Sequence, residues 1–183
     1  MSEKEEKISA LAKQIIELSR NSLVVNLRFL DRAISMLKIE YCYETDSIAT
    51  DSVKFLCNPR YVISRYAEDR NYPVRDYLHS VMHCVFRHMY VFDCDTVLWS
   101  LACDIAVESL ILEIDISSLS LQSDSVKASE ISKIKKDVKL VTAEKIYAYF
   151  RNNPVNSKRI DDLIDLFSVD EHNLWYAQSE PHQ

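Results

Sequence analysis

The sequence predicts a mainly α-helical α+β domain with a small β-sheet or hairpin ahead of a histidine-bearing helix. Apolar residues recur at helical spacing over residues 1–38 and 72–112, whereas residues 39–59 contain short β-prone runs. The 183 residues are 48% hydrophobic and 27% charged, as is typical of one soluble globular domain. We therefore treat residues 1–183 as a single domain.

The N-terminal part, residues 1–38, is expected to form two helices. Apolar residues follow a helical period over residues 8–16 and again over residues 27–37. Asn21 and Ser22 lie between these stretches, and both residue types favour turns over helix interiors. We place the break between the helices there.

Residues 39–59 are expected to form a small sheet. The runs IEYCYE and VKFLCN are β-prone, and SIATDSVKFLCN is typical of a hairpin whose two-residue turn is Asp51-Ser52. The chain contains no glycine. Its turns must therefore be made by other residues, and any position that needs a positive φ carries a cost.

A helix is expected to start at Asn71-Tyr72-Pro73, with Pro73 in the first turn, where its missing N–H does no harm. One face is apolar from Val74 to Met89. The opposite face carries Asp76, His79, Ser80, His83 and Arg87. His79 and His83 are thus one turn apart on the same side.

A second helix is expected from Asp95 to about residue 112. It is apolar almost all round, as in a buried helix. The exceptions are Ser100, Asp104 and Glu108, spaced by four residues. Because buried carboxylates are costly without partners, this stripe should face the histidines of the preceding helix.

The remaining third of the chain is expected to be less regular. Residues 113–140 are rich in Ser and Lys and predict a long exposed loop with at most a short helix. Residues 141–176 hold the C-terminal elements: a helix capped by Thr142, the short apolar run IDDLIDLF, and a tail with His172.

Composition argues against several classes of function. The net charge is −6 and the basic residues are scattered, so no nucleic-acid partner is expected. No apolar run approaches the roughly 20 residues of a membrane span, and the charged N-terminus does not resemble a signal peptide. Five cysteines without close pairing fit a reducing, cytoplasmic setting. Cys84 and Cys103 each lie next to a candidate ligand.

The histidine helix contains HSVMH, which differs from the zinc-protease motif H-E-x-x-H only at Ser80. Two histidines spaced by four can bind one zinc ion, and Asp104 is the candidate third ligand. A serine hydroxyl cannot act as a general base near neutral pH unless another base activates it. Glu108, one turn from Asp104, is a candidate substitute ligand or relocated base.

His88 lies five residues after His83, about 140° further round a regular helix. It can be a ligand only if the helix ends or bends before it. The alternative is a helix-end histidine that interacts with the negative pole of the helix macrodipole.

A series of motifs follows in a characteristic order along residues 45–176. The series comprises Asn58-Pro59, then His79, His83 and His88, then Trp99-Ser-Leu-Ala-Cys-Asp104, then TAEKIY from residue 142, and finally Asp170-Glu-His172-Asn-Leu-Trp175. This order resembles the metallopeptidase domain that bacterial proteins carry ahead of a von Willebrand factor A-like domain.

The resemblance implies a zincin-like fold with zinc as cofactor, His79 and His83 as ligands and Asp104 as the third ligand. It leaves the roles of His88 and His172 open. His172 either returns to the metal, orients a ligand or substrate, or is a surface histidine near the C-terminus. Family association points to a von Willebrand factor A-like domain or a partner ATPase as partners. The chain ends soon after Trp175 without such a domain, as in a stand-alone member or a piece of a longer protein.

The sequence departs from the family pattern at functional positions. Ser80 replaces the catalytic glutamate, Ser100 and Glu108 replace two asparagines, and Arg87 stands where a small residue is frequent.

Three hypotheses follow. The first is a zinc-binding metallopeptidase-like domain that has lost peptidase activity and serves binding or regulation. The second is an active zinc hydrolase that uses Glu108 or another group as base, and the third is a metal-free protein-interaction scaffold.

Overall fold

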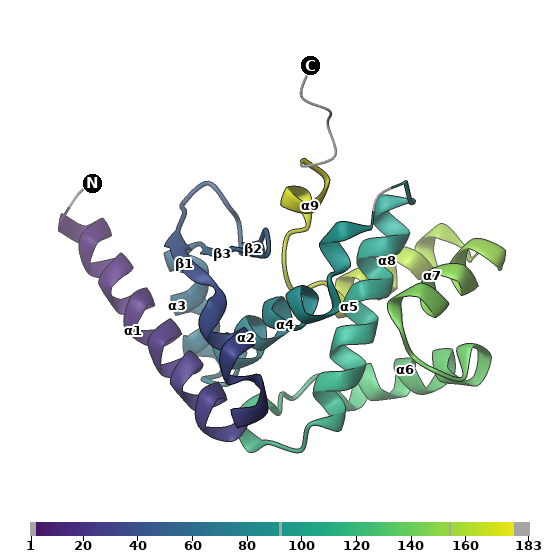
Figure 1. Cartoon of the computed structure of the whole chain (residues 1–183), viewed down its shortest axis with the longest axis horizontal. Coiled ribbons are helices and arrows are strands. Elements are labelled where there is room, and N and C mark those ends of the chain that lie inside the picture. Colours follow the sequence, from purple (N-terminus) through teal and green to yellow (C-terminus); the bar gives the residue numbers. More distant parts are fainter. Residues whose placement is uncertain (1–2, 92, 154, 178–183) are drawn as a thin grey trace.

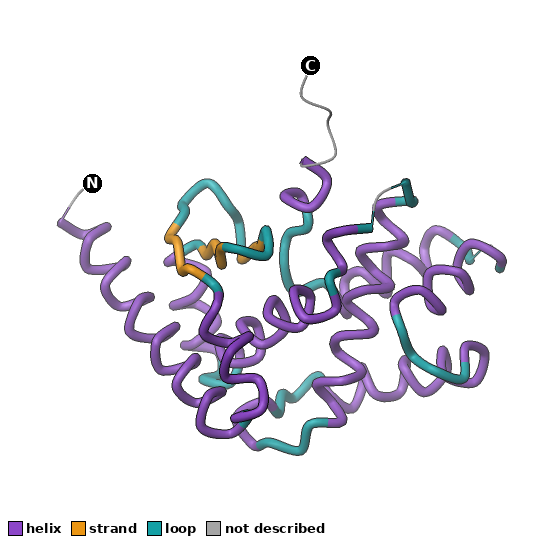
Figure 2. Tube along the Cα trace, in the orientation of Figure 1, coloured by secondary structure: helices purple, strands orange, loops and turns teal. Residues whose placement is uncertain are grey.

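The computed structural model describes residues 3–91, 93–153 and 155–177. The chain is mainly helical with one small sheet, as Figures 1 and 2 show, which confirms the predicted fold class. The elements are α1 (Glu3–Asn26), α2 (Asp31–Met36), β1 (Lys38–Tyr41), β2 (Ile48–Thr50), β3 (Lys54–Cys57), α3 (Pro59–Glu68), α4 (Tyr72–Phe86), α5 (Thr96–Glu113), α6 (Asp124–Val138), α7 (Ala143–Asn152), α8 (Ser157–Phe167) and α9 (Asn173–Ala177). Short 3₁₀ turns cover Arg28–Leu30, His88–Tyr90 and Ser117–Leu119. No helix among the described residues is both long and apolar enough to cross a membrane.

The predicted break at Asn21-Ser22 is wrong, because α1 continues without interruption to Asn26. Its buried face extends through this region, from Ile16 to Leu23. Packing of that face outweighs the weak helix propensity of the two polar residues. The interruption comes instead at the 3₁₀ turn that precedes α2.

The sheet has the strand order β1-β3-β2. Strands β2 and β3 form the predicted antiparallel hairpin, whereas β1 pairs with β3 in parallel. The turn is longer than expected, because Thr50 pairs with Phe55 and four residues connect them. Ser52 adopts a positive φ of 78°, and Asp51 Oδ1 accepts hydrogen bonds from the N–H groups of Val53 and Lys54. These contacts stabilise a turn made without glycine.

Helix α3 was not predicted. Asn58 caps it by accepting a hydrogen bond from Arg60 N at 2.9 Å, and Pro59 occupies its first position. Helix α4 begins as predicted and ends at Phe86. Arg87 terminates it in the left-handed conformation, with a φ of 59°, which in most proteins would favour glycine.

Helix α5 lies between two hydrophobic clusters and contributes to both. The helix begins where the sequence predicts, and Asp95 caps it by accepting a hydrogen bond from Leu98 N at 3.0 Å. The first cluster joins α5 to α1, α2, the sheet, α3 and α4. The second joins it to α6, α7, α8 and Trp175. Helices α4 and α5 therefore meet near the centre of the molecule (Figure 1).

The predicted exposed loop over residues 113–140 is wrong, because α6 occupies most of it. Ile131 and Ile134 are buried against the second cluster, and Lys127 is buried as well. Three buried positions spaced by three or four residues form a narrow helical face. Because Ser and Lys dominate the composition of the segment, an assignment from composition does not recognise this narrow buried face. Helices α7 and α8 occupy the predicted positions.

The segment after α8 attaches to the edge of the sheet. Glu171 forms a parallel bridge with Ala49, and its N–H donates to the carbonyl of Ile48 at 2.8 Å. Trp175 is buried, and its Nε1–H donates to the carbonyl of Thr50 at 3.0 Å. This attachment brings Asp170 and His172 back toward α4 and α5.

Candidate metal centre

The polar faces of α4 and α5 meet in the protein interior, as the sequence predicts. His79 and His83 come from α4, and Asp104 and Glu108 come from α5. All four side chains are almost completely buried. The polar stripe on the otherwise apolar helix α5 thus has the histidines as partners.

Four residues place potential ligand atoms within 4.8 Å of one another: His79, His83, Asp104 and Asp170. The Nε2 atoms of His79 and His83 each lie 3.3 Å from Asp104 Oδ1. Their distances to Asp170 Oδ1 are 3.5 and 3.6 Å. We call these four residues the His/Asp cluster, and this buried group could hold a metal ion.

The geometry of the His/Asp cluster fits a metal of zinc-like size. Donor atoms around a tetrahedral zinc ion, with bonds of about 2.0–2.1 Å, lie about 3.3–3.4 Å apart. The nitrogen–oxygen distances of 3.3–3.6 Å are close to that separation. His83 Nε2 is buried and has no hydrogen-bond partner among the described residues. An orphaned imidazole nitrogen that faces two carboxylates is well placed to bind a cation.

His172 is buried beside the cluster, so its alternative as a surface histidine is wrong. Its Nε2 lies 2.9 Å from Asp170 Oδ1 and 3.3 Å from Asp104 Oδ1. Asp170 and His172 flank the bridged residue Glu171, and alternate residues of an extended segment point to the same side. The backbone pairing at Glu171 therefore turns both side chains toward the cluster.

Glu108 contacts the His79 ring on the side opposite the His/Asp cluster and orients it. The Nδ1–H of His79 donates to Glu108 Oε1 at 3.0 Å, which leaves Nε2 facing the cluster. The other carboxylate oxygen, Oε2, accepts from Arg75 Nη2 at 2.7 Å and from Lys127 Nζ at 2.6 Å. Glu108 is thus occupied by three buried partners and does not belong to the His/Asp cluster.

His88 contacts His83 on the side away from the cluster. Because α4 ends at Phe86 and the chain reverses at Arg87, the ring of His88 turns back to its own helix. The Nδ1 atoms of His83 and His88 are 2.9 Å apart and share a hydrogen bond. His88 is therefore placed to orient a ligand, not to bind a metal directly.

Ser80 is fully buried, and its hydroxyl donates to Asp170 Oδ2 at 3.4 Å. Ser100 takes no part in the cluster and shares a hydrogen bond with the Tyr176 hydroxyl at 2.8 Å. Cys84 and Cys103 are free thiols outside the cluster. Burial raises the pKa of the Cys84 thiol to about 11, which makes it a poor thiolate ligand.

The electrostatics of the site divide the histidines into two pairs. Burial lowers the pKa of His79, but hydrogen bonds to Asp104 and Glu108 outweigh it and raise the pKa to about 10. Asp104 and Asp170 likewise raise the pKa of His172 against the effect of burial. Burial lowers the pKa of His83, and burial with the nearby His83 lowers that of His88 to about 3.

Burial alone would raise the pKa of each buried carboxyl group of the site, but the neighbouring cations reverse this effect. The charge of His172 and the hydrogen bond from His79 outweigh burial and hold the pKa of Asp104 below its ordinary value. His172, whose Nε2 also hydrogen-bonds to Asp170 Oδ1 at 2.9 Å, does the same for Asp170. Without a metal ion, these shifts thus favour ionised aspartates beside the cationic forms of His79 and His172.

Two cavities reach the cluster. One, of about 360 Å³, is lined by Asp104, Asp170 and His172. The other, of about 540 Å³, is lined by Asp170 together with Asp76 and Arg75. A ligand as small as a metal ion or a short polar group therefore has an approach from either side of Asp170.

The structure brings together His79, His83 and Asp104, which the sequence indicated as a group, and adds Asp170 and Arg75, which the sequence analysis did not indicate as site residues. Asp170 had a visible signal, since it lies two residues before His172. Arg75 had none, because its role depends on the position of Glu108 across the helix interface. Comparison with protein-family models, curated proteins and solved structures finds no match to this chain.

Proposed function

We propose that this chain is a zinc-binding, metallopeptidase-like domain that has lost its general base and serves binding or regulation instead of hydrolysis. The observation that carries the proposal is the convergence of two imidazole nitrogens and two carboxylate oxygens at 3.3–3.6 Å, with His83 Nε2 left without a partner. His79, His83, Asp104 and Asp170 would hold the ion, with His172 beside them. The resemblance of the motif order to the metallopeptidase domain supports zinc as the metal.

A bound zinc ion would supply a Lewis acid and an activated water at this site. The chain must then provide a base to accept the proton of that water. Ser80 stands where the resemblance expects a glutamate, and its hydroxyl donates to Asp170. A serine hydroxyl that donates to Asp170 cannot act as a general base near neutral pH, which supports a loss of hydrolysis.

Glu108 is a poor replacement for the missing base. Its two oxygens accept from His79, Arg75 and Lys127. These partners outweigh the effect of burial and hold the pKa of Glu108 far below its ordinary value. Such a carboxylate binds a proton too weakly for general-base catalysis, and its position behind His79 removes it from the metal-facing side.

A metal-free scaffold is the second candidate function, and one observation favours it. The pKa shifts of His79 and His172 are those of imidazolium groups that neutralise Asp104 and Asp170 without a metal. A buried network of this kind can fix a fold by itself. It leaves His83 Nε2 unsatisfied, however, which a bound metal would correct.

The test is the zinc content of the untagged chain, measured by elemental analysis after dialysis against trace zinc. We expect about one zinc per chain in the wild type and none in a His79→Ala/His83→Ala variant. Circular dichroism and thermal unfolding of both proteins establish that the variant is folded. If the folded wild type contains no zinc even after zinc is added back, the metal-free scaffold is the better-supported function.

Activity forms the second arm of the test. The zinc-loaded wild type is incubated with a mixture of unstructured peptides, and the products are followed by mass spectrometry. We expect no zinc-dependent cleavage. Cleavage that disappears in Glu108→Gln, with zinc still bound and the variant still folded by circular dichroism, would establish the active hydrolase instead.

A further inference from the structure

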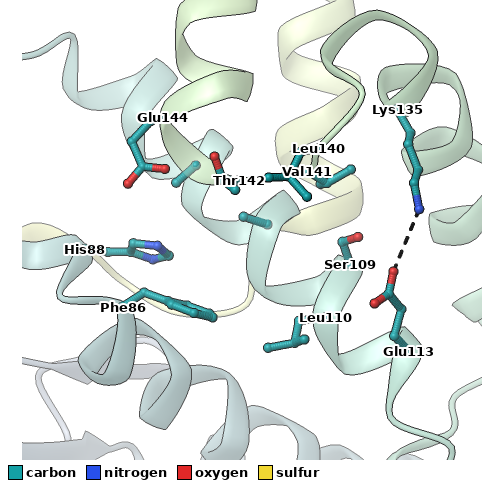
Figure 3. Close-up of a pocket in the computed structure, with 12 residues that line it drawn as sticks. Phe86, His88, Ser109, Leu110, Glu113, Lys135, Leu140, Val141, Thr142 and Glu144 are labelled. Atoms are coloured by element: carbon teal, nitrogen blue, oxygen red, sulfur yellow. Dashed lines mark ion pairs between the residues drawn. The ribbon is translucent and has the colours of Figure 1, made fainter.

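A separate cavity of about 440 Å³ lies between the end of α4, the middle of α5 and the start of α7 (Figure 3). Its walls are largely apolar, with Phe86, Leu110 and Val141 among them. Its volume falls within the range of small-molecule sites. No residue of the His/Asp cluster lines it. We call it the His88 cavity, because His88 is its connection to that cluster.

His88 and Glu144 are among the polar groups of the His88 cavity in Figure 3, together with the hydroxyl groups of Thr142, which accepts from Lys145 N, and Ser109. His88 Nδ1 is bonded to His83, so Nε2, on the far side of the ring, is directed away from His83. Within the described residues, His88 Nε2 makes no hydrogen bond and the carboxylate of Glu144 has no hydrogen-bond or ion-pair partner. Both groups are therefore available to a ligand.

A metal ion on His83 would fix the proton positions of this histidine pair. Ligation through His83 Nε2 requires its proton on Nδ1, which then donates to His88 Nδ1. His88 must in turn carry its own proton on Nε2. The cavity then presents one N–H donor, from His88, and one anionic acceptor, from Glu144.

We propose that the His88 cavity binds a small molecule with an apolar body and a neutral amide head. The amide carbonyl accepts from His88 Nε2–H, and the amide N–H donates to Glu144. A carboxylate head would be repelled by Glu144, whereas an ammonium head would pair with Glu144 but leave the Nε2–H of His88 without an acceptor. The other charged side chains of the lining, Glu113 and Lys135, lie 4.0 Å apart and pair with each other.

The proposal predicts a link between the two sites, and this part rests on the proposed zinc function. Zinc selects the tautomer of His88 that donates into the cavity. If this tautomer is about half populated without zinc, zinc tightens amide binding about twofold. By reciprocity, the amide tightens zinc binding by the same factor.

A purely structural role for Glu144 is the competing explanation. It lies in the first turn of α7, after the cap Thr142, where a carboxylate interacts favourably with the helix macrodipole. That role predicts a change in thermal stability on substitution. It predicts no change in the preference among ligands.

The test uses three probes of matched size: 3-phenylpropionamide, 3-phenylpropionate and 3-phenylpropylamine. Their affinities for the full chain are measured by NMR titration, with and without zinc. We expect the amide to bind about tenfold more tightly than either charged analogue. Glu144→Gln should raise the affinity of the carboxylate relative to the amide, whereas Asp161→Asn, at an exposed position of α8, should not.

A third variant fills the space instead of changing the charge. Val141→Trp should abolish amide binding while thermal unfolding remains cooperative. The proposal is overturned if no probe binds, or if Glu144→Gln leaves the preference among the probes unchanged. Equal amide affinity with and without zinc in a zinc-binding protein would overturn the link. Amide binding in a protein that takes up no zinc would disprove the zinc function alone.

Discussion

The hydroxyl of Ser80 lies 3.4 Å from Asp170 Oδ2, while the other oxygen of that carboxylate faces His79 at 3.5 Å. The side chain at position 80 thus contacts the His/Asp cluster through Asp170. A glutamate at this position would place a second carboxylate beside Asp170. Two carboxylates so close repel each other unless a cation lies near both.

Ser80→Glu should therefore make the protein depend on metal. We expect the metal-free variant to lose about 1–3 kcal/mol of unfolding free energy, from overpacking and charge repulsion. Zinc should restore much of this loss, and zinc-dependent peptide cleavage should appear. Urea denaturation with and without zinc measures the first effect. Ser80→Gln, of equal size without the charge, is the control; equal zinc rescue of both variants would disprove the repulsion argument.

Glu108→Gln should destabilise the fold strongly. Arg75 and Lys127 both donate to Glu108 Oε2, and removal of this charge leaves two buried cations without their common partner. Breaking a buried ion pair in this way costs about 3–5 kcal/mol. The free energy of unfolding, from chemical denaturation, measures the loss.

The matched control is Glu113→Gln on the same helix. Glu113 is exposed and lies 4.0 Å from Lys135, so its loss should change stability by no more than about 0.5 kcal/mol. Similar losses in both variants would contradict a central role for the network around Glu108.

The residues at the His/Asp cluster should differ in their effect on zinc affinity. Asp170→Asn removes a proposed ligand and should weaken zinc binding by more than about 100-fold. His88→Gln removes only the partner of His83 and should weaken it by about 10- to 100-fold. Competition with a fluorescent chelator measures both. Asp162→Asn, at an exposed position of α8, should leave affinity unchanged; the opposite order of the two effects would assign the ligand role to His88.

Much of the fold could be predicted from the sequence, because the signals were local. Asp95 and Thr142 mark helix starts with side chains that accept from their own first turns. The course of α6 could not be predicted in the same way. Its buried face consists of Lys127, Ile131 and Ile134, and a lysine at a buried position is recognised only when its partner Glu108 is known.

The site residues, too, could be predicted only where the signal was local. The spacing of His79 and His83 and the stripe containing Asp104 predicted a contact between two helices. The contribution of Asp170 depends on the bridge between Ala49 and Glu171, a pairing between segments far apart in the sequence. Periodicity within one segment carries no information about such a pairing.

Zinc affinity should rise with pH. The pKa of His79 is raised to about 10, so this imidazole is cationic near neutral pH in the metal-free protein, and Asp104 and Asp170 raise the pKa of His172 in the same direction. Zinc must displace the extra proton of any cationic imidazole that it binds. For each proton released, the apparent affinity for zinc rises about tenfold when the pH rises by one unit. Chelator competition at several pH values between 6 and 8 measures the slope. An affinity independent of pH would indicate neutral histidines before zinc binds.

Asp76 should also make the stability of the metal-free protein depend on pH. Burial raises its pKa from 3.8 to about 7, although Arg65 and His79 lower it in part. The folded chain therefore holds this proton more tightly than the unfolded chain, and the resulting stability is complete below pH 3.8 and lost as the pH rises to about 7. The loss should be a few kcal/mol, at about 1.4 kcal/mol per pKa unit.

Asp76→Asn imitates the protonated side chain and should remove that loss. The Tyr61 hydroxyl, 3.3 Å from Asp76 Oδ2, can still donate to the amide oxygen. We expect the variant to gain stability relative to the wild type as the pH rises from 4 to 7, because the neighbouring groups titrate alike in both proteins. Urea denaturation at each pH measures the difference. A constant difference between the two proteins across this range would mean that Asp76 is ionised throughout, with Arg65 as an effective partner.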